Sequence, residues 1–94
     1  MTLTVQNQLT LLHDLLDEQL TDSSASIAEY QQIKRLVESM IQKGAITDEE
    51  LLQLLPDIYN YGREGENAQS LSEHIEINKE NIYNWKHIIE QNHL

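Results

Sequence analysis

Residues 26–44 read SIAEYQQIKRLVESMIQKG, and they contain the beginning, the apolar face and the end of one helix. Ser26 and Glu29 form a capping box, in which the hydroxyl accepts from a backbone N–H three residues on and the carboxylate reaches back to the cap. Apolar side chains then recur at helical spacing. Lys43 suits the negative end of the helix dipole, and Gly44 is typical of the left-handed position that ends a helix. The stretch therefore predicts one amphipathic helix that ends at Lys43.

The same kind of starting signal recurs twice, at Thr47-Asp48-Glu49-Glu50 and at Ser70-Leu71-Ser72-Glu73. A fourth apolar stripe precedes the first capping box. The sequence therefore predicts an all-α fold, a small bundle of four main helices over residues 4–20, 27–43, 48–62 and 71–92. Proline removes a backbone hydrogen bond and clashes with the preceding turn. We therefore expect the third helix to be kinked or broken at Pro56.

The length of 94 residues predicts a single helical domain over residues 1–94. Within it, residues 62–69 contain two glycines and mostly polar side chains. This composition is typical of a connection between elements. We expect a flexible linker over residues 62–69.

Composition and charge exclude several classes of function. Sixteen acidic against six basic residues give a formal net charge of −10, and cysteine is absent. Binding to nucleic acid or to an anionic membrane requires Lys and Arg, so this charge disfavours both. Disulfides and Cys-based zinc sites are excluded. No apolar run is long enough to span a membrane and no secretory signal is present, which predicts a cytoplasmic protein.

One segment has a second interpretation. Residues 71–86 resemble the spacing of a repressor-type helix-turn-helix, with Glu76-Ile77 as the turn and Asn78 at the start of the second helix. Lys79, Glu80, Asn81 and Asn84 would then face the DNA groove, and Ile82 and Trp85 would pack inward. Glu76 stands where glycine is usual, and the acidic side chains disfavour approach to phosphate. A single continuous helix is the simpler interpretation, and a break at residues 76–78 would favour DNA binding.

No arrangement of residues indicates catalysis. His13 and Asp17 are four residues apart and could form a weak metal site, but a solvated polar helix face is the simpler explanation for them. No nucleophile elbow and no phosphate-binding glycine loop are present. The sequence predicts no catalytic residue, no metal ligand and no cofactor, and hence a protein that is not an enzyme.

The leucine content suggests a surface for association. A small bundle rarely buries so many adjacent leucines at once, and an exposed apolar surface usually marks a partner site. We expect an interface that includes Leu11, Leu15, Leu52, Leu54 and Tyr61. Self-association as a homodimer is the simplest form of such an interface, and the sequence does not identify any other protein partner.

Taken over nearly its full length, the chain resembles the YtzH-like family of small uncharacterised bacterial proteins. The resemblance rests on Gln8-Leu9-x-Leu11-Leu12-x-Asp14-Leu15-Leu16, Gln19-x-Thr21-Asp22, Ala28-Glu29-Tyr30-x-Gln32-Ile33-x-Arg35-Leu36-Val37, Ile58-Tyr59-x-Tyr61 and Leu71-x-x-His74-Ile75 with Trp85. In the family two cysteines often follow the Thr-Asp step, where this chain has Ser23 and Ser24. The resemblance implies that residues 71–85 belong to a whole-chain fold, and it implies no activity, cofactor or partner.

These observations predict a cytosolic protein–protein interaction or regulatory module that associates with itself. The alternative is a DNA-binding regulator that uses the helix-turn-helix-like segment at residues 71–86.

Overall fold

The computed structural model describes residues 4–21, 26–44 and 46–93, and within these ranges it is helical with no strand. The five helices are α1 (Val5–Thr21), α2 (Ile27–Lys43), α3 (Glu49–Glu66), α4 (Leu71–Ile77) and α5 (Lys79–His93). The predicted all-α fold is confirmed, with five helices in the described ranges instead of four. Ser23 and Ser24 lie outside the described residues.

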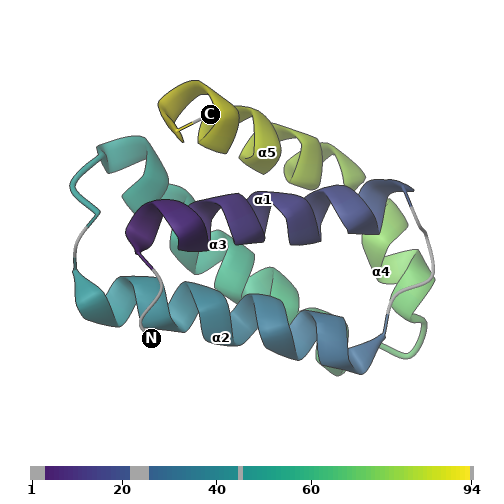
Figure 1. Ribbon diagram of the computed structural model, residues 1–94. Helices are drawn as coiled ribbons and strands as arrows, with labels where there is room; N and C mark the ends of the chain where they lie inside the picture. The colour runs from purple at the N-terminus through teal and green to yellow at the C-terminus, as the bar shows by residue number, and fades with distance from the viewer. Residues whose placement is uncertain (1–3, 22–25, 45, 94) are drawn as a thin grey trace.

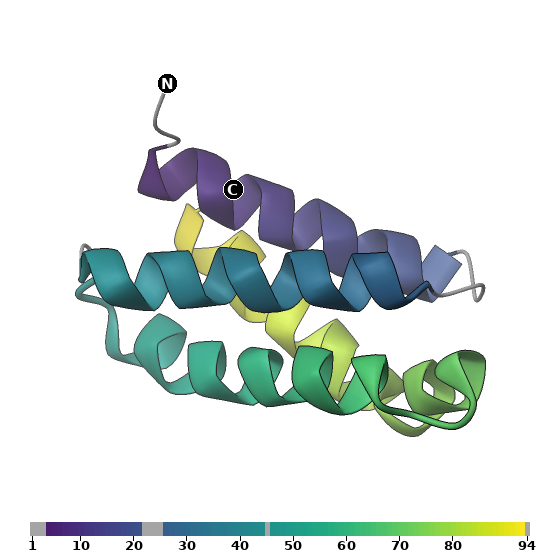
Figure 2. The same cartoon turned by 90° about the horizontal axis from the view of Figure 1, so that it is seen from below.

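Helices α1, α2 and α3 lie side by side, each antiparallel to the one before it (Figure 1). The view from below shows α2 between α1 and α3 (Figure 2). The short helix α4 lies at one end of this layer, and α5 returns across it. Helix α5 packs mainly on α1 and less extensively on α3. Within the described ranges, no helix is both long and apolar enough to cross a bilayer.

One apolar core joins all five helices. Its side chains are less than a tenth exposed. Burial of their apolar surface is the main force that stabilises the bundle. They are Leu9, Leu12, Leu15, Leu16, Tyr30, Ile33, Leu36, Val37, Met40, Ile46, Leu51, Leu54, Leu55, Ile58, Tyr61, Ile75, Ile82, Trp85 and Ile89.

Helix α3 passes through Pro56 without ending. Of the two predicted alternatives, the break at Pro56 is therefore wrong, and the kink stays a prediction. The hydrogen bond that proline cannot donate would run to the carbonyl of Leu52, four residues earlier. Both Pro56 and Leu52 are exposed, so water can hydrate that carbonyl. The helix tolerates proline here because the lost bond is on its solvent side.

The predicted linker over residues 62–69 also needs correction, because α3 continues to Glu66. The connection to α4 consists only of residues 67–70. Gly62 and Gly65 are buried against Tyr30 of α2, and an added Cβ at Gly65 would overlap the Tyr30 ring. These glycines permit close packing of two helices and do not make a flexible segment.

The final segment is not one continuous helix. Asn78 separates α4 from α5, and its side-chain amide donates to the His74 carbonyl at 2.9 Å. Its own carbonyl accepts from the N–H of Ile82, which begins the first turn of α5. The prediction of a single helix over residues 71–92 is wrong, and the break falls at the position that the alternative interpretation required.

Candidate functional site

The leucine-rich surface predicted from the sequence is mostly interior. Leu15, Leu54 and Tyr61 are core residues, and Leu11 is partly buried against the core. Leu52 is 44% exposed. The bundle therefore buries three of the five side chains in its own core and covers Leu11 in part. Leu52 is the most exposed of the five.

A different surface is hollowed, along the junction of α3 and α5. One hollow of about 360 Å³ and a neighbouring one of about 200 Å³ share Asp57, Asn84 and Trp85, so they form one continuous depression. We call it the α3–α5 trough. Its lining consists of Glu50, Gln53, Leu54, Asp57, Asn60, Tyr61 and Glu64 from α3, Asn78 between the helices, and Asn81, Asn84, Trp85 and Ile88 from α5.

The polar side chains of the trough are mainly free to bind a partner. Within the described residues, the side chains of Asp57, Asn60, Glu64 and Asn84 make no hydrogen bond or ion pair. All four are exposed. Amides provide both donors and acceptors, and carboxylates provide acceptors. The trough therefore presents a row of hydrogen-bonding groups that the fold does not use.

The floor of the trough is rigid because its aromatic side chains pack on one another. Trp85 is 7% exposed and meets Tyr61 edge to face at 5.6 Å between ring centroids. Tyr61 stacks on His74 at 4.8 Å and donates its hydroxyl proton to the Gln19 side chain. Burial raises the pKa of Tyr61 well above its ordinary value of 10.0, so the hydroxyl stays a donor.

The imidazole of His74 fixes this floor from the side of α4. Its Nε2 atom lies 3.0 Å from the carbonyl oxygen of Tyr61. A carbonyl can only accept, so Nε2 carries a proton in this arrangement. His74 therefore acts as a structural link between α3 and α4.

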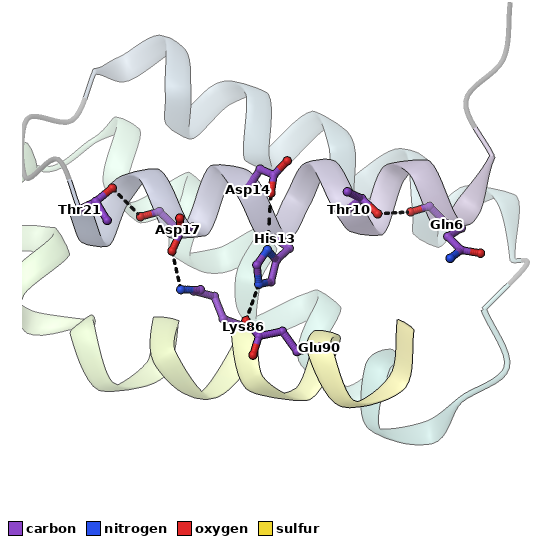
Figure 3. A network of polar contacts seen from close by, with 8 residues as sticks. All are labelled: Gln6, Thr10, His13, Asp14, Asp17, Thr21, Lys86 and Glu90. Atoms are coloured by element: carbon purple, nitrogen blue, oxygen red, sulfur yellow. Dashed lines mark hydrogen bonds and ion pairs between the residues drawn. The ribbon is translucent and has the colours of Figure 1, made fainter. Parts of the chain in front are cut away.

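Two polar contacts join α5 to α1 (Figure 3). Lys86 Nζ lies 2.6 Å from Asp17 Oδ1, and His13 Nε2 lies 2.7 Å from Glu90 Oε2. His13 is therefore engaged in a helix–helix contact. No group of three or more potential metal ligands occurs in the described part of the chain.

These contacts predict an acid-sensitive attachment of α5. The hydrogen bond from Lys86 lowers the pKa of Asp17 below 3.8, and the hydrogen bond with His13 lowers the pKa of Glu90 below 4.5. A lowered pKa in the folded state stabilises the fold above the unfolded pKa, and this contribution is lost as pH falls through the folded pKa. We expect the urea midpoint to fall between about pH 5 and pH 2.

The double variant Asp17→Asn/Glu90→Gln should show a smaller fall in the urea midpoint over this pH range. Some dependence should remain, because Lys34 also lowers the pKa of Glu66. The control is Glu18→Gln, at an exposed position of α1 where the side chain makes no hydrogen bond or ion pair with the described residues. An unchanged acid dependence in the double variant would contradict the assignment.

The side chains proposed for DNA contact have the predicted exposure. Lys79, Glu80, Asn81 and Asn84 are exposed, and Ile82 and Trp85 are buried. The exposed face of α5 lies next to Asp57 and Glu64 of α3, which share the larger hollow with its asparagines. Acidic side chains therefore lie beside the helix that would have to approach phosphate.

Sequence reasoning identified Asn81, Asn84 and Trp85 but did not place them beside α3. Asp57, Asn60 and Glu64 were missed as site residues. Their only sequence signal is their spacing of three and four residues, which puts them on one face of α3. The partner face on α5 could not be known before the break at Asn78 set the direction of that helix.

Comparison with known proteins defines the class of this small helical protein. The model of a family described as "YtzH-like protein" matches residues 3–89, so the chain belongs to the YtzH-like family. It is similar to "Uncharacterized protein YtzH" of Bacillus subtilis (strain 168), with 28% identity over 85 residues that cover 90% of this chain and 91% of that protein. No solved structure matches the chain.

Proposed function

We propose that this chain is a non-catalytic protein-interaction module and that the α3–α5 trough is its binding surface. The observation that carries the proposal is the row of unpaired hydrogen-bonding side chains above a rigid aromatic floor, formed by Asp57, Asn60, Glu64 and Asn84 over Trp85. Such groups can pair with another protein without rearrangement of the helices, so the entropy cost of binding is limited to ordering side chains.

The side-chain amides of Asn60 and Asn84 can be removed to test whether the trough binds a protein. Asn60 and Asn84 are exposed, and their side chains make no hydrogen bond or ion pair with the described residues, so the fold should remain intact when both are replaced by alanine. If each amide forms one hydrogen bond to the partner, the loss is about 1–3 kcal/mol in total. We expect at least one protein from the lysate of the native host to bind the immobilised wild type about tenfold more than the variant.

The matched control is Gln32→Ala/Gln42→Ala, which removes two exposed amides from α2. This variant should retain every partner that the wild type captures, as measured by quantitative mass spectrometry. If Asn60→Ala/Asn84→Ala retains all of them too, or if the wild type captures nothing, the trough is not a protein-binding surface.

A DNA-binding regulator is the second candidate, and the break between α4 and α5 at Asn78 favours it. A helix-turn-helix requires such a change of direction, and Lys79, Asn81 and Asn84 have the exposure that groove contacts need. Fluorescence anisotropy with random duplex DNA at low salt tests it. Salt-dependent binding that Lys79→Gln weakens would favour this candidate, and absence of binding at low salt would exclude it.

Self-association is a separate proposal that uses a different part of the surface. It is supported by Leu52, which is exposed near the start of α3. Sedimentation of the variant Leu52→Asp tests this proposal.

A further inference from the structure

We propose that the α3–α5 trough binds a basic helical segment of a partner protein through two arginine side chains seven residues apart. This inference rests on the proposed function, because it specifies the chemistry of the partner that occupies the same surface. It is carried by the charge of the trough, by its division into two hollows and by the aromatic ring that both hollows share.

The charge of the trough has one sign. Glu50, Asp57 and Glu64 lie along the α3 wall, each seven residues after the previous one. Among the described residues, no lysine, arginine or histidine lines either hollow. The nearby cation Lys86 points to the other side of α5, where it pairs with Asp17. A partner with positive side chains therefore meets uncompensated negative charge, and charge complementarity speeds association and selects the partner.

The size of the hollows limits what can enter them. Their volumes of about 200 and 360 Å³ fall at or below the lower end of the range of about 300–1,000 Å³ that is typical of sites for whole small molecules. Each hollow is open to the surface and suits one long side chain supplied by a partner lying across it. Two hollows in one depression therefore indicate two such side chains.

The polar groups of the lining favour arginine over lysine. A guanidinium has five donors in a fixed plane, whereas an ammonium is a compact charge with three donors. Asp57, which both hollows share, offers carboxylate acceptors, and the neighbouring amides of Asn60 and Asn84 offer carbonyl oxygens. The planar guanidinium also stacks on aromatic side chains, and the accessible part of Trp85 lines both hollows.

The spacing along α3 sets the spacing on the partner. Seven residues of helix correspond to about 10.5 Å along the axis. The carboxylates of Glu50, Asp57 and Glu64 therefore repeat at that interval. A second helix that lies along α3 presents side chains at the same interval when they are seven residues apart. The partner segment is accordingly a helix with arginines at positions i and i+7.

Trp85 gives a direct measurement, because it is the only tryptophan in the chain and lines both hollows. The probe is an alanine-rich helical peptide of about 18 residues, long enough to be helical, with two arginines seven residues apart. Two peptides of the same sequence carry lysine or citrulline at those positions. Citrulline keeps the planar shape of arginine and lacks its charge. Titration at low salt is followed by Trp85 fluorescence and by the NMR signals of the asparagine side-chain amides.

We expect the arginine peptide to shift the Trp85 emission and the amide signals of Asn60 and Asn84. Its affinity should be higher than that of the lysine peptide and at least tenfold higher than that of the citrulline peptide. The variant Asp57→Asn/Glu64→Gln should bind the arginine peptide with about tenfold lower affinity, which corresponds to about 1.4 kcal/mol of binding free energy. The control Glu18→Gln/Glu38→Gln removes the same amount of charge from exposed positions on α1 and α2. It should change the affinity by less than about twofold.

Equal binding of the citrulline peptide, or equal weakening by the two charge variants, would overturn the arginine proposal. Equal binding of the lysine peptide would overturn the preference for a guanidinium. If the peptides do not bind but Asn60→Ala/Asn84→Ala loses a partner from lysate, the basic partner is wrong and the trough remains a protein-binding surface. If both experiments fail, the proposed function fails with the inference.

Discussion

Replacing Leu12 by aspartate should unfold the protein. Leu12 is fully buried in the core of α1. Loss of a buried leucine side chain costs about 2–5 kcal/mol, and an uncompensated buried carboxylate costs several kcal/mol more. The total approaches the whole stability of a domain of this size, which is about 5–15 kcal/mol. We expect far-UV circular dichroism to show loss of helix at 25 °C, and amide NMR signals to collapse into a narrow range.

The matched variant is Leu52→Asp, because the same substitution falls on an exposed leucine of α3. Leu52 lies in the turn that follows the cap at Asp48, where a negative charge complements the helix dipole. This variant should remain folded, with a change in stability within about 1 kcal/mol. If the wild type forms a dimer through Leu52, sedimentation should show that Leu52→Asp is a monomer.

A folded Leu12→Asp protein that had lost only its self-association would contradict this account. It would mean that the Leu12 face of α1 is an interface between copies and not the interior of one chain. The pair of variants therefore separates the two explanations for the leucine content of this sequence, which the sequence alone left open.

The helix starts could be predicted because their signals are local. The capping box at Ser26 is confirmed. The Glu29 N–H donates to the Ser26 hydroxyl at 3.2 Å, and the Glu29 carboxylate accepts from the Ser26 N–H at 3.4 Å. The third helix starts one residue later than predicted, since Asp48 and not Thr47 is its cap. Asp48 accepts from the Leu51 N–H at 3.1 Å. A carboxylate also complements the helix dipole, and a threonine hydroxyl has no such charge.

The break at Asn78 could not be predicted from apolar spacing. Ile75, Ile82 and Trp85 are all buried, although they lie in two different helices. Their spacing of seven and three residues fits a single helix as well as two helices that are separated by one residue. The apolar spacing continues unchanged across the break, so the sequence pattern does not reveal the change of helix direction.

The trough could not be predicted because it is a product of tertiary packing. Asp57 and Asn84 belong to different helices and are 27 positions apart in the sequence. Each is an ordinary polar residue on the exposed side of its own helix. They acquire a shared role only because α5 packs mainly on α1 and leaves an open junction with α3. The α1 contacts that hold α5 in this position, Lys86–Asp17 and His13–Glu90, are equally long-range.

Replacing Gly65 by alanine should strongly destabilise the protein, although the same change normally stabilises a helix. In a helix interior, alanine is favoured over glycine by about 1 kcal/mol. At Gly65 the new Cβ would overlap the ring of Tyr30. That ring cannot move aside freely, because Tyr30 is fully buried and donates its hydroxyl proton to the Leu71 carbonyl at 2.9 Å. Overpacking of this kind costs about 1–3 kcal/mol or more.

We expect Gly65→Ala to lower the free energy of unfolding by about 2 kcal/mol and the Tm by roughly 8–16 °C, measured by urea and thermal denaturation. A second variant identifies the cause. In a Tyr30→Leu background the ring is gone, so adding Gly65→Ala should have little effect or recover the helical preference of alanine. Equal destabilisation in both backgrounds would show that Tyr30 is not the obstacle. The close contact of α2 with α3 would then not be the reason that helix α3 contains glycine at this position.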